Sequence, residues 1–190
     1  MSSSFTVLYD ASVLYPAPLR DLLMQLALTD LYRARWTEQI HEEWMRSLLK
    51  KRPDLTRTQL NYTRQLMNRH VRDCLIDNYE ELIPAVTLPD PDDRHVLAAA
   101  IKGEVDVIVT MNLRDFPASV LAKYEVEAQH PDDFIIDLID LDPYAVIKSV
   151  KICHARLKNP PKSVDEYLYI LTKQQLTVTV SRLRKLWHEI

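Results

Sequence analysis

The chain has 190 residues, enough for one domain with an appendage or for two small units with a hydrophobic core. Hydrophobic residues make up 47% and charged residues 27%, as is typical of a globular protein. No apolar run approaches the length of a membrane span, and the first residues lack the features of a secretory signal. We therefore expect a cytoplasmic protein without membrane association.

Residue composition excludes several kinds of site. The single glycine, Gly103, rules out a glycine-rich loop for a dinucleotide or a phosphate. The two cysteines, Cys74 and Cys153, have no metal-binding spacing, so we expect buried, reduced thiols.

Charge is unevenly distributed along the chain, although the net charge is only −3. Residues 46–72 contain eight bases and one acid, and residues 80–142 contain fifteen acids and four bases. Residues 148–190 contain nine bases and three acids. An acidic centre between basic surfaces suits a cation site that acts on a polyanion, but solvated helix faces give the same pattern.

The first predicted element is a buried strand over Phe5 to Tyr9, which ends in Asp10. Ligands of open α/β sheets bind at the carboxyl ends of strands, so Asp10 is well placed for function. A turn or capping aspartate is the alternative. A helix with its apolar stripe over Leu19 to Ala27 follows.

A second helix is predicted to begin after Thr37, its N-cap residue. Its buried face consists of Ile40, Trp44 and Leu48. Glu43 lies beside that face and can reach an interior site, whereas Glu42 points away. An ordinary surface glutamate is the alternative for Glu43.

Pro53 ends this helix, and Thr56 or Thr58 begins the next one, which is amphipathic and basic. A short strand is predicted near Ile83 to Thr87, before the most acidic stretch of the chain.

That stretch begins with Asp90, Pro91, Asp92 and Asp93, which we interpret as an N-cap followed by the first turn of a buried helix. Asp93 shares the buried stripe with Val96, Leu97 and Ala100. A buried carboxylate needs a cation or hydrogen-bond donors, which favours a functional role for Asp93. For Asp90 and Asp92, a role in capping the helix and complementing its dipole is the alternative.

After Gly103, the predicted helix C-cap, the strongest strand of the sequence runs from Val105 to Thr110. It leads to three polar residues: Thr110, Asn112 and Asp115. They are placed for function at a strand end, although Asn and Asp also favour turns.

The chain then predicts an edge strand over Val126 to Ala128 and a closing helix over Pro131 to Ile139. A tail with only helical patterns follows, interrupted at Pro160 and Pro161. We expect one α/β domain over residues 1–140 and a helical extension over residues 141–190.

Alternation of strands and helices predicts an α/β fold with a mostly parallel sheet. Its carboxyl edge would gather Asp10, Asp93 and Asp115, and Glu43 can reach the same place. Four carboxylates without His or Cys ligands favour Mg²⁺ or Mn²⁺. Such an ion organises water as a nucleophile and stabilises the charge that develops on a phosphate during cleavage.

Five stretches together resemble the PIN domain family, whose members include the VapC-type toxins of toxin–antitoxin systems. The stretches are Val7 to Leu14, Ile40 to Trp44, Asp90 to Ala100, Val109 to Phe116 and His130 to Phe134. The resemblance covers residues 5–134 and implies a three-layer fold, metal-dependent ribonuclease activity and an antitoxin partner.

The resemblance also implies roles for individual residues. The family's acidic quartet falls on Asp10, Glu43, Asp93 and Asp115, which would hold one or two ions. Three further residues would assist them: Asp90, Thr110 and Asn112. The RNA backbone would be held by the basic segment, represented by Lys50, Lys51, Arg52, Arg57, Arg64 and Arg72.

Two other functions fit parts of the pattern. A strand that ends in aspartate also begins haloacid-dehalogenase-type phosphatases, but their second acid is replaced here by Ser12. A non-catalytic PIN-like module that binds RNA or protein is the other alternative. The tail departs from the compact toxin pattern and could shield the site, form a homodimer, contact RNA or receive an antitoxin.

Overall fold

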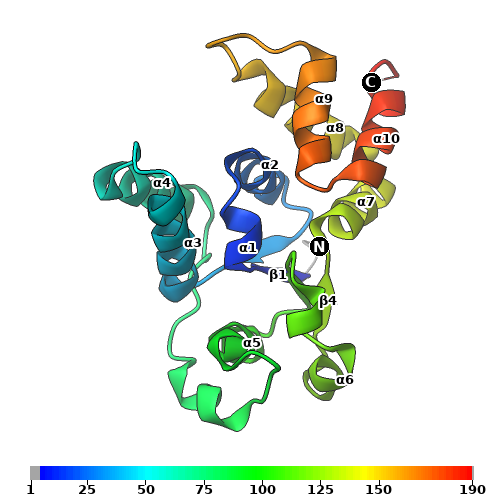
Figure 1. The fold of residues 1–190 in the computed structure, drawn as a ribbon. Coiled ribbons are helices and arrows are strands. Elements are labelled where there is room, and N and C mark those ends of the chain that lie inside the picture. Colours follow the sequence, from blue (N-terminus) through cyan, green and yellow to red (C-terminus); the bar gives the residue numbers. More distant parts are fainter. Residues whose placement is uncertain (1–4, 190) are drawn as a thin grey trace.

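The computed structural model describes residues 5–189 and shows a parallel β-sheet surrounded by helices (Figure 1). The sheet has four strands in the order β2-β1-β3-β4. The strands are β1 (Thr6–Tyr9), β2 (Arg33–Arg35), β3 (Val107–Val109) and β4 (Glu127–Gln129). All three neighbouring pairs are parallel. The predicted α/β class with a mostly parallel central sheet flanked by helices is thereby confirmed.

The two central strands consist of buried residues, and they carry the first polar groups of the site at their carboxyl ends. Val7, Leu8, Ile108 and Val109 are fully shielded from solvent. Asp10 follows β1 and Thr110 follows β3, and the two strands are paired in register from Val7 with Val107 onward. Because parallel strands end at the same edge, both polar side chains reach one place.

Helices flank the sheet and connect its strands. Within the first 130 residues they are α1 (Ala11–Leu14), α2 (Ala17–Ala27), α3 (Glu38–Lys51), α4 (Arg57–His70), α5 (Arg94–Lys102) and α6 (Ala118–Leu121). Short 3-10 helices are η1 (Glu80–Ala85), η2 (Pro91–Asp93), η3 (Leu113–Asp115) and η4 (Ala122–Tyr124). Helix α3 packs against α1 and α4, while α5 packs against η1 and η2. In Figure 1, α3 and α4 lie on one flank and α5 and α6 on another.

Capping residues fix where the two helices of the basic segment begin. The Thr37 side chain accepts a hydrogen bond from the Ile40 amide, as predicted for an N-cap. Thr56 and Gln59 form a capping box at the start of α4, which decides between the two threonines that the sequence offered. The first cap sets the rotation of α3, and hence the direction of Glu43.

Two strand predictions differ from the structure. The strand expected near Ile83 to Thr87 is wrong, because the 3-10 helix η1 extends to Ala85 and contains Pro84, which has no amide hydrogen for a sheet ladder. Strand β2 was not predicted, because its three residues include two arginines and lack an apolar pattern. Its pairing with β1 nevertheless completes the sheet.

The tail folds into helices packed on α2 and α7. The last four helices are α7 (Pro131–Leu141), α8 (Pro143–Ala155), α9 (Val164–Lys173) and α10 (Thr177–Leu186). Helices α8 and α9 contact α2, and α10 contacts α7 and α9 (Figure 1). The division at residue 140 stays a prediction, because α7, before it, packs against α8 and α10, after it. Within residues 5–189, no helix is both long and apolar enough to cross a membrane.

Candidate active site

Asp10 is the buried acid of the site, with only 5% of its surface exposed. Its Oδ2 accepts hydrogen bonds from the hydroxyls of Ser12 at 2.7 Å and Thr110 at 2.9 Å. The Ser12 hydroxyl in turn accepts from the Met111 amide, and the Thr110 hydroxyl accepts from the Asn112 amide. Burial raises the pKa of Asp10, and the two hydroxyl donors oppose that rise. Ser12 in α1 and Thr110 after β3 therefore hold one carboxylate in a fixed orientation.

The acidic stretch forms a tight turn before α5. Asp90 accepts a hydrogen bond from the Asp92 amide at 2.9 Å, as expected of a cap, and Pro91 follows it. This first turn is the 3-10 helix η2, so α5 itself begins only at Arg94. Asp93 is half-buried whereas Asp92 is exposed, in agreement with the predicted helical register.

Asp93 lies where the negative charges of the site converge. Its pKa is raised to about 7, first by burial and then by the charges of four nearby carboxylates. These belong to Asp10, Asp90, Asp115 and Glu43. The other three members of the predicted quartet, Asp10, Glu43 and Asp115, thus all contribute to the raised pKa of Asp93.

Glu43 reaches the site from α3 and is held by a histidine. Its Oε1 lies 2.5 Å from Nε2 of His95, a residue of α5 that is 3% exposed. The other ring nitrogen of His95, Nδ1, is buried without a hydrogen-bond partner among residues 5–189. A proton on Nε2 satisfies this arrangement, because Nε2 then donates to the carboxylate while Nδ1 carries only a lone pair.

The cavity in front of these acids has a volume of about 550 Å³ and is open to solvent. It is lined by Asp10, Ala11, Ser12, Tyr15, Glu43, Trp44, Arg46, Ser47, Lys51, Asp92, Asp93, Met111 and Asn112. Asp115 and Asp90 are not part of the lining, and Asp115 is half-buried in η3. The structure therefore brings three members of the quartet to the wall and keeps the fourth within electrostatic range.

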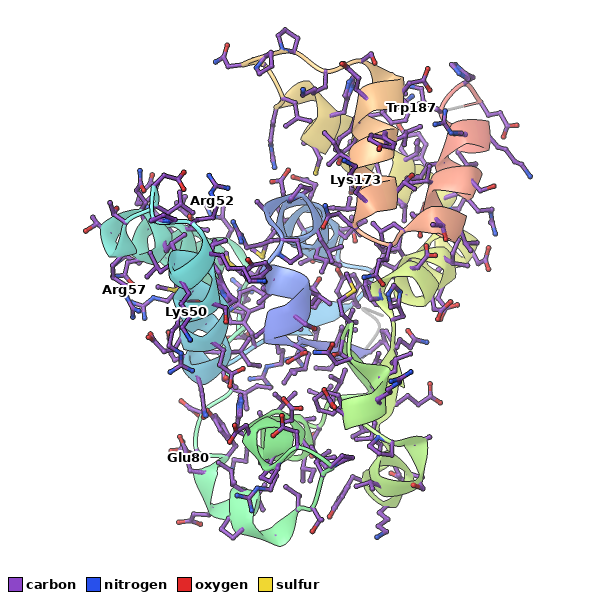
Figure 2. All side chains as sticks on the ribbon, in the orientation of Figure 1. Lys50, Arg52, Arg57, Glu80, Lys173 and Trp187 are labelled. Carbon is purple, nitrogen blue, oxygen red and sulfur yellow. The ribbon has the colours of Figure 1, made fainter. Side chains whose placement is uncertain are left out.

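The six cations predicted to hold RNA do not face the cavity together. Only Lys51 lines it. Three arginines are paired with acids: Arg52 with Asp54 at 2.7 Å, Arg57 with Glu42 at 2.5 Å and Arg64 with Glu38 at 3.2 Å. Figure 2 shows Lys50, Arg52 and Arg57 on the side of the molecule formed by α3 and α4. Arg72 borders another cavity, beside Tyr32 and Arg33.

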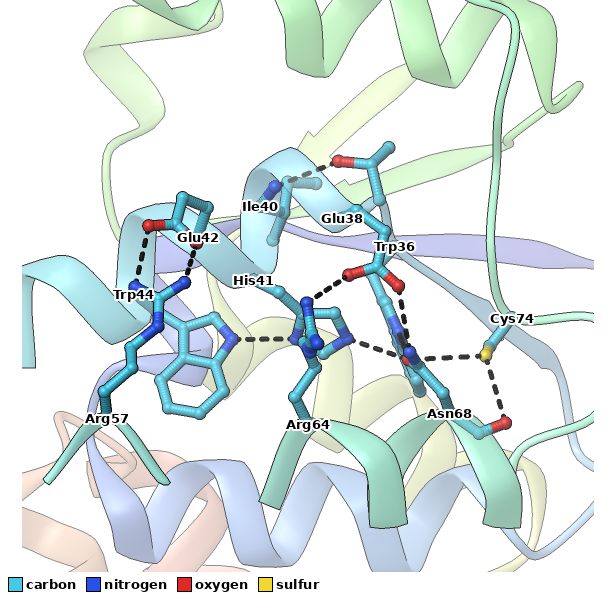
Figure 3. A network of polar contacts seen from close by, with 11 residues as sticks. Trp36, Glu38, Ile40, His41, Glu42, Trp44, Arg57, Arg64, Asn68 and Cys74 are labelled. Carbon is cyan, nitrogen blue, oxygen red and sulfur yellow. Dashed lines mark hydrogen bonds and ion pairs between the residues drawn. The ribbon is translucent and has the colours of Figure 1, made fainter. Parts of the chain in front are cut away.

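Beneath this basic surface, a polar network joins α3 to α4 (Figure 3). Asn68 Oδ1 contacts Nε2 of His41 at 2.8 Å and accepts a hydrogen bond from the Trp36 indole at 2.8 Å. Nδ1 of His41 accepts from the Trp44 indole at 3.0 Å, so His41 donates through Nε2. The network fixes α3, which carries Glu43 on its other side.

The donors of the site are suited to a hard cation, but they are not gathered as a closed coordination shell. Among residues 5–189, no three His, Cys, Asp or Glu side chains lie close enough to hold a metal ion. The charges of nearby carboxylates nevertheless add to burial in raising the pKa of Asp93. Oxygen ligands without thiolates fit Mg²⁺ or Mn²⁺, and a cation would offset these charges.

Sequence reasoning missed four residues of the site. Ser12 was considered only as a missing acid, yet it holds Asp10. His95 lay in the Asp90 to Ala100 stretch without an assigned role, and Tyr15 was not selected. Arg46 was assigned to the basic segment but not to the cavity. A hydroxyl two residues after a strand-end aspartate was a signal for Ser12. The contact of His95 with Glu43 joins residues 52 positions apart and has no signal in the sequence.

Comparisons with known proteins agree with this geometry. A family model described as PIN domain matches residues 6–114, and one described as VapC50 C-terminal domain matches residues 131–185. A relative from Mycobacterium tuberculosis described as "Putative ribonuclease VapC50" is 49% identical over 63 residues, which are 33% of this chain and 37% of the relative. The match thus spans little more than a third of that relative's length. No solved structure matches significantly.

The two matched regions leave residues 115–130 between them, with α6, η4 and strand β4 of the sheet. The PIN domain model spans more than half of the chain and includes Asp10, Glu43 and Asp93, although it ends just before Asp115. The second model covers helices α7 to α10, except for the last residue of α10. Sequence motifs, sheet topology and the family model agree, and the chain belongs to the PIN domain family.

Proposed function

We propose that this protein is a metal-dependent endoribonuclease that hydrolyses RNA phosphodiester bonds at the cavity of Asp10, Glu43 and Asp93. The convergence of these carboxylates on one open cavity, with Asp115 in electrostatic range, is the observation that carries the proposal. Membership of the PIN domain family and the similarity to a protein named as a ribonuclease support it.

The divalent cation, Mg²⁺ or Mn²⁺, would be held by oxygens of Asp10, Glu43, Asp93 and Asp115. Bound there, it would supply an activated water and neutralise charge on the scissile phosphate. The protein's own contribution is to orient the ligands. Ser12 and Thr110 fix Asp10, and His95 fixes Glu43.

Asn112 lines the same cavity and offers a side-chain amide to a phosphate oxygen. In the reaction, water adds to phosphorus, the bond from phosphorus to the leaving ribose oxygen breaks, and that oxygen takes up a proton. Asp90, whose charge raises the pKa of Asp93 but whose side chain caps η2, is an auxiliary acid in this scheme.

Cleavage should require both a divalent cation and the buried carboxylate. We expect purified protein with Mg²⁺ or Mn²⁺ to cut a mixed pool of structured cellular RNAs at discrete positions. EDTA or Asp10→Asn should abolish cutting, since the amide keeps an oxygen for Ser12 and Thr110 but loses the charge that holds a cation. The measurement is gel or sequencing detection of the fragments.

Circular dichroism of Asp10→Asn controls for loss of fold. Cutting that survives the substitution would come from a contaminating nuclease. RNA binding without cleavage by the wild-type protein would instead support the alternative, a PIN-like binding module.

His95 should act through Glu43. We expect His95→Ala to raise the Mg²⁺ concentration needed for half-maximal cleavage by about tenfold, because loss of a residue that orients a metal ligand weakens the metal site. His95→Gln should recover part of the loss, since its amide can still donate to the carboxylate. A titration of cleavage with Mg²⁺ measures the effect, and an unchanged half-maximum would reduce His95 to a packing residue.

We further propose that the protein is the toxin of a type II toxin–antitoxin system. The support is the family match of the tail to the VapC50 C-terminal domain. Expression of the wild-type chain should stop the growth of a host cell, while Asp10→Asn should not. Growth arrest by both variants would separate toxicity from cleavage. Co-purification should identify a cognate antitoxin and show whether the chain forms a homodimer.

A further inference from the structure

Strand β4 forms one edge of the sheet, and its outer side is free for pairing. In the strand order β2-β1-β3-β4, its only neighbour within residues 5–189 is β3. The Glu127 amide donates to the Asp106 carbonyl and the Gln129 carbonyl accepts from the Thr110 amide, so the backbones of Glu127 and Gln129 face β3. Successive residues of a strand direct their backbone groups to opposite sides. The amide and carbonyl of Ala128 therefore point away from the sheet.

A cavity of about 790 Å³ lies along this edge. Residues 125–128 line one side of it, and the other side is lined by Leu113, Phe116, Ala118 and Ala122. Helix α6 packs against β4 here (Figure 1). Leu113 is apolar and yet 43% exposed. Neither matched family region includes residues 116–128. An extended chain along the edge would meet unpaired backbone groups and apolar side chains together.

The charge of the cavity is negative. Its two charged lining residues are the exposed acids Glu125 and Glu127, and neither forms an ion pair among the described residues. Side chains alternate along β4, so Glu127 points to one face of the sheet and Ala128 to the other. A strand added at this edge would alternate in the same way. Cationic side chains on its Glu127 face and apolar ones on its Ala128 face would complement the edge.

The same charges disfavour a second copy of the chain as the occupant. Pairing of two β4 edges would bring the acids of both copies to one interface, and like charges on paired strands are destabilising. Charged side chains at a sheet edge hinder self-pairing for this reason. Because β4 is only three residues long, backbone pairing alone binds weakly, and side-chain charge has to select the partner.

We propose that the β4 edge and its cavity bind an extended cationic segment of a separate protein, which adds a strand to the sheet. The amide and carbonyl of Ala128 pair with the backbone of that segment, and Leu113 contacts its apolar side chains. Glu125 and Glu127 bind its lysine or arginine side chains. The proposal does not depend on the ribonuclease function.

The test uses the full-length protein and a synthetic peptide of alternating lysine and valine, about six residues long, the usual length of a strand. Isothermal titration calorimetry at low salt should show binding. A peptide of alternating glutamate and valine should bind about tenfold more weakly or not at all. A peptide of the same composition with all lysines before all valines should also bind more weakly. Equal binding of these two lysine peptides would reduce the effect to charge attraction and overturn the added strand.

Backbone pairing is tested from both sides of the new ladder. Methylation of the peptide's backbone nitrogens keeps its side chains but removes the donors to Ala128, so binding should weaken about fivefold. Ala128→Pro removes the outward amide without breaking a bond to β3 and should weaken binding by a similar factor. Ala128→Val is the control that keeps the amide. If Ala128→Pro fails to fold by circular dichroism, the methylated peptide decides on the wild type, and unchanged binding of it would reject the ladder.

Two matched variants test the charge. Glu127→Gln keeps the size of the side chain and should weaken binding of the lysine–valine peptide about threefold. Glu80→Gln removes an exposed acid at the start of η1, away from β4 (Figure 2), and should leave binding unchanged. Equal effects of the two substitutions would replace the proposed contact with attraction by the net charge of the protein.

Analytical ultracentrifugation distinguishes a separate protein from a second copy. We expect the peptide to bind without changing the oligomeric state of the chain. A wild-type dimer that Ala128→Pro converts to a monomer would assign the edge to self-association and overturn the proposal. So would failure of the alternating lysine–valine peptide to bind the wild type at low salt.

Discussion

Asp93→Asn should stabilise the metal-free protein at pH 8 while it abolishes cleavage. The wild-type carboxylate is half-buried among four others, and its pKa is raised to about 7 by burial and by their charges. Asparagine keeps the shape but removes the charge. We expect a gain of about 1 kcal/mol at pH 8, after allowance for solvent screening of a half-buried group. This corresponds to about 3 °C in Tm for a chain of this size.

The sign of the pH dependence follows from the direction of the shift. In the unfolded chain Asp93 loses its proton near its ordinary pKa of about 4, whereas the folded protein retains that proton up to about 7. Because the folded state binds more protons in this interval, stability falls as the pH rises from about 4 to about 7. The advantage of Asp93→Asn should therefore be small at pH 4 and complete above pH 7.

Thermal unfolding in EDTA across this pH range measures the effect. Asp92→Asn is the matched control, since it removes a charge from the same turn but from an exposed position that does not raise the pKa of Asp93. Saturating Mg²⁺ should make the wild type more stable than Asp93→Asn. A ligand at a hundred times its Kd adds about 2.7 kcal/mol to the stability of the protein that binds it. Equal destabilisation by Asp93→Asn at pH 4 and pH 8 would contradict the clustering of charge.

Much of the acidic site could be predicted because it depends on local rules. Asp10 follows a buried strand, and Asp93 shares a helical stripe with three apolar residues, so sequence alone selects both. Glu43 follows from the rotation of α3, which Thr37 fixes as its cap. Each of these inferences needs only the geometry of one strand or one helix.

The surroundings of the acids depend on contacts between distant segments, and these leave little local signal. His95 meets Glu43 across the interface of α5 and α3, and Ser12 reaches the Met111 amide from the neighbouring strand end. Similarly, the composition of the basic segment does not reveal that two of its arginines, Arg57 and Arg64, form ion pairs with Glu42 and Glu38 of α3. Which cations face the cavity is decided by how α3 and α4 pack, not by their number.

The stretch from His130 to Phe134, which is part of the family resemblance, contains an aspartate that binds the last helix of the tail. Asp132 is 8% exposed, and its two carboxylate oxygens accept hydrogen bonds from the amides of Val178 at 3.0 Å and Thr179 at 2.8 Å. These amides lie in the first turn of α10, where backbone donors have no partner within the helix. Asp132 of α7 thus caps the N-terminus of α10, and its negative charge interacts favourably with the dipole of that helix.

Asp132→Ala should consequently release the C-terminal helix. Loss of two charge-assisted hydrogen bonds, one to the buried residue Thr179, should cost about 3 kcal/mol and lower Tm by about 9 °C. Asp132→Asn should cost less, because its amide oxygen can still accept from one of the two donors. Asp133→Ala is the control: this neighbour is exposed in the same turn of α7 and should change stability by about 0.5 kcal/mol.

Thermal unfolding gives the overall loss, and hydrogen exchange shows where it arises. Compared with the wild type, Asp132→Ala should accelerate exchange of the α10 amides more than that of the β1 and β3 amides. The reason is that the Asp132 cap joins α10 to α7 and does not support the sheet. Uniformly faster exchange would mean that tail and sheet unfold as one cooperative unit, against a separable extension. Protection of α10 equal to that of the wild type would show that apolar packing on α7 and α9, not the Asp132 carboxylate, holds the helix in place.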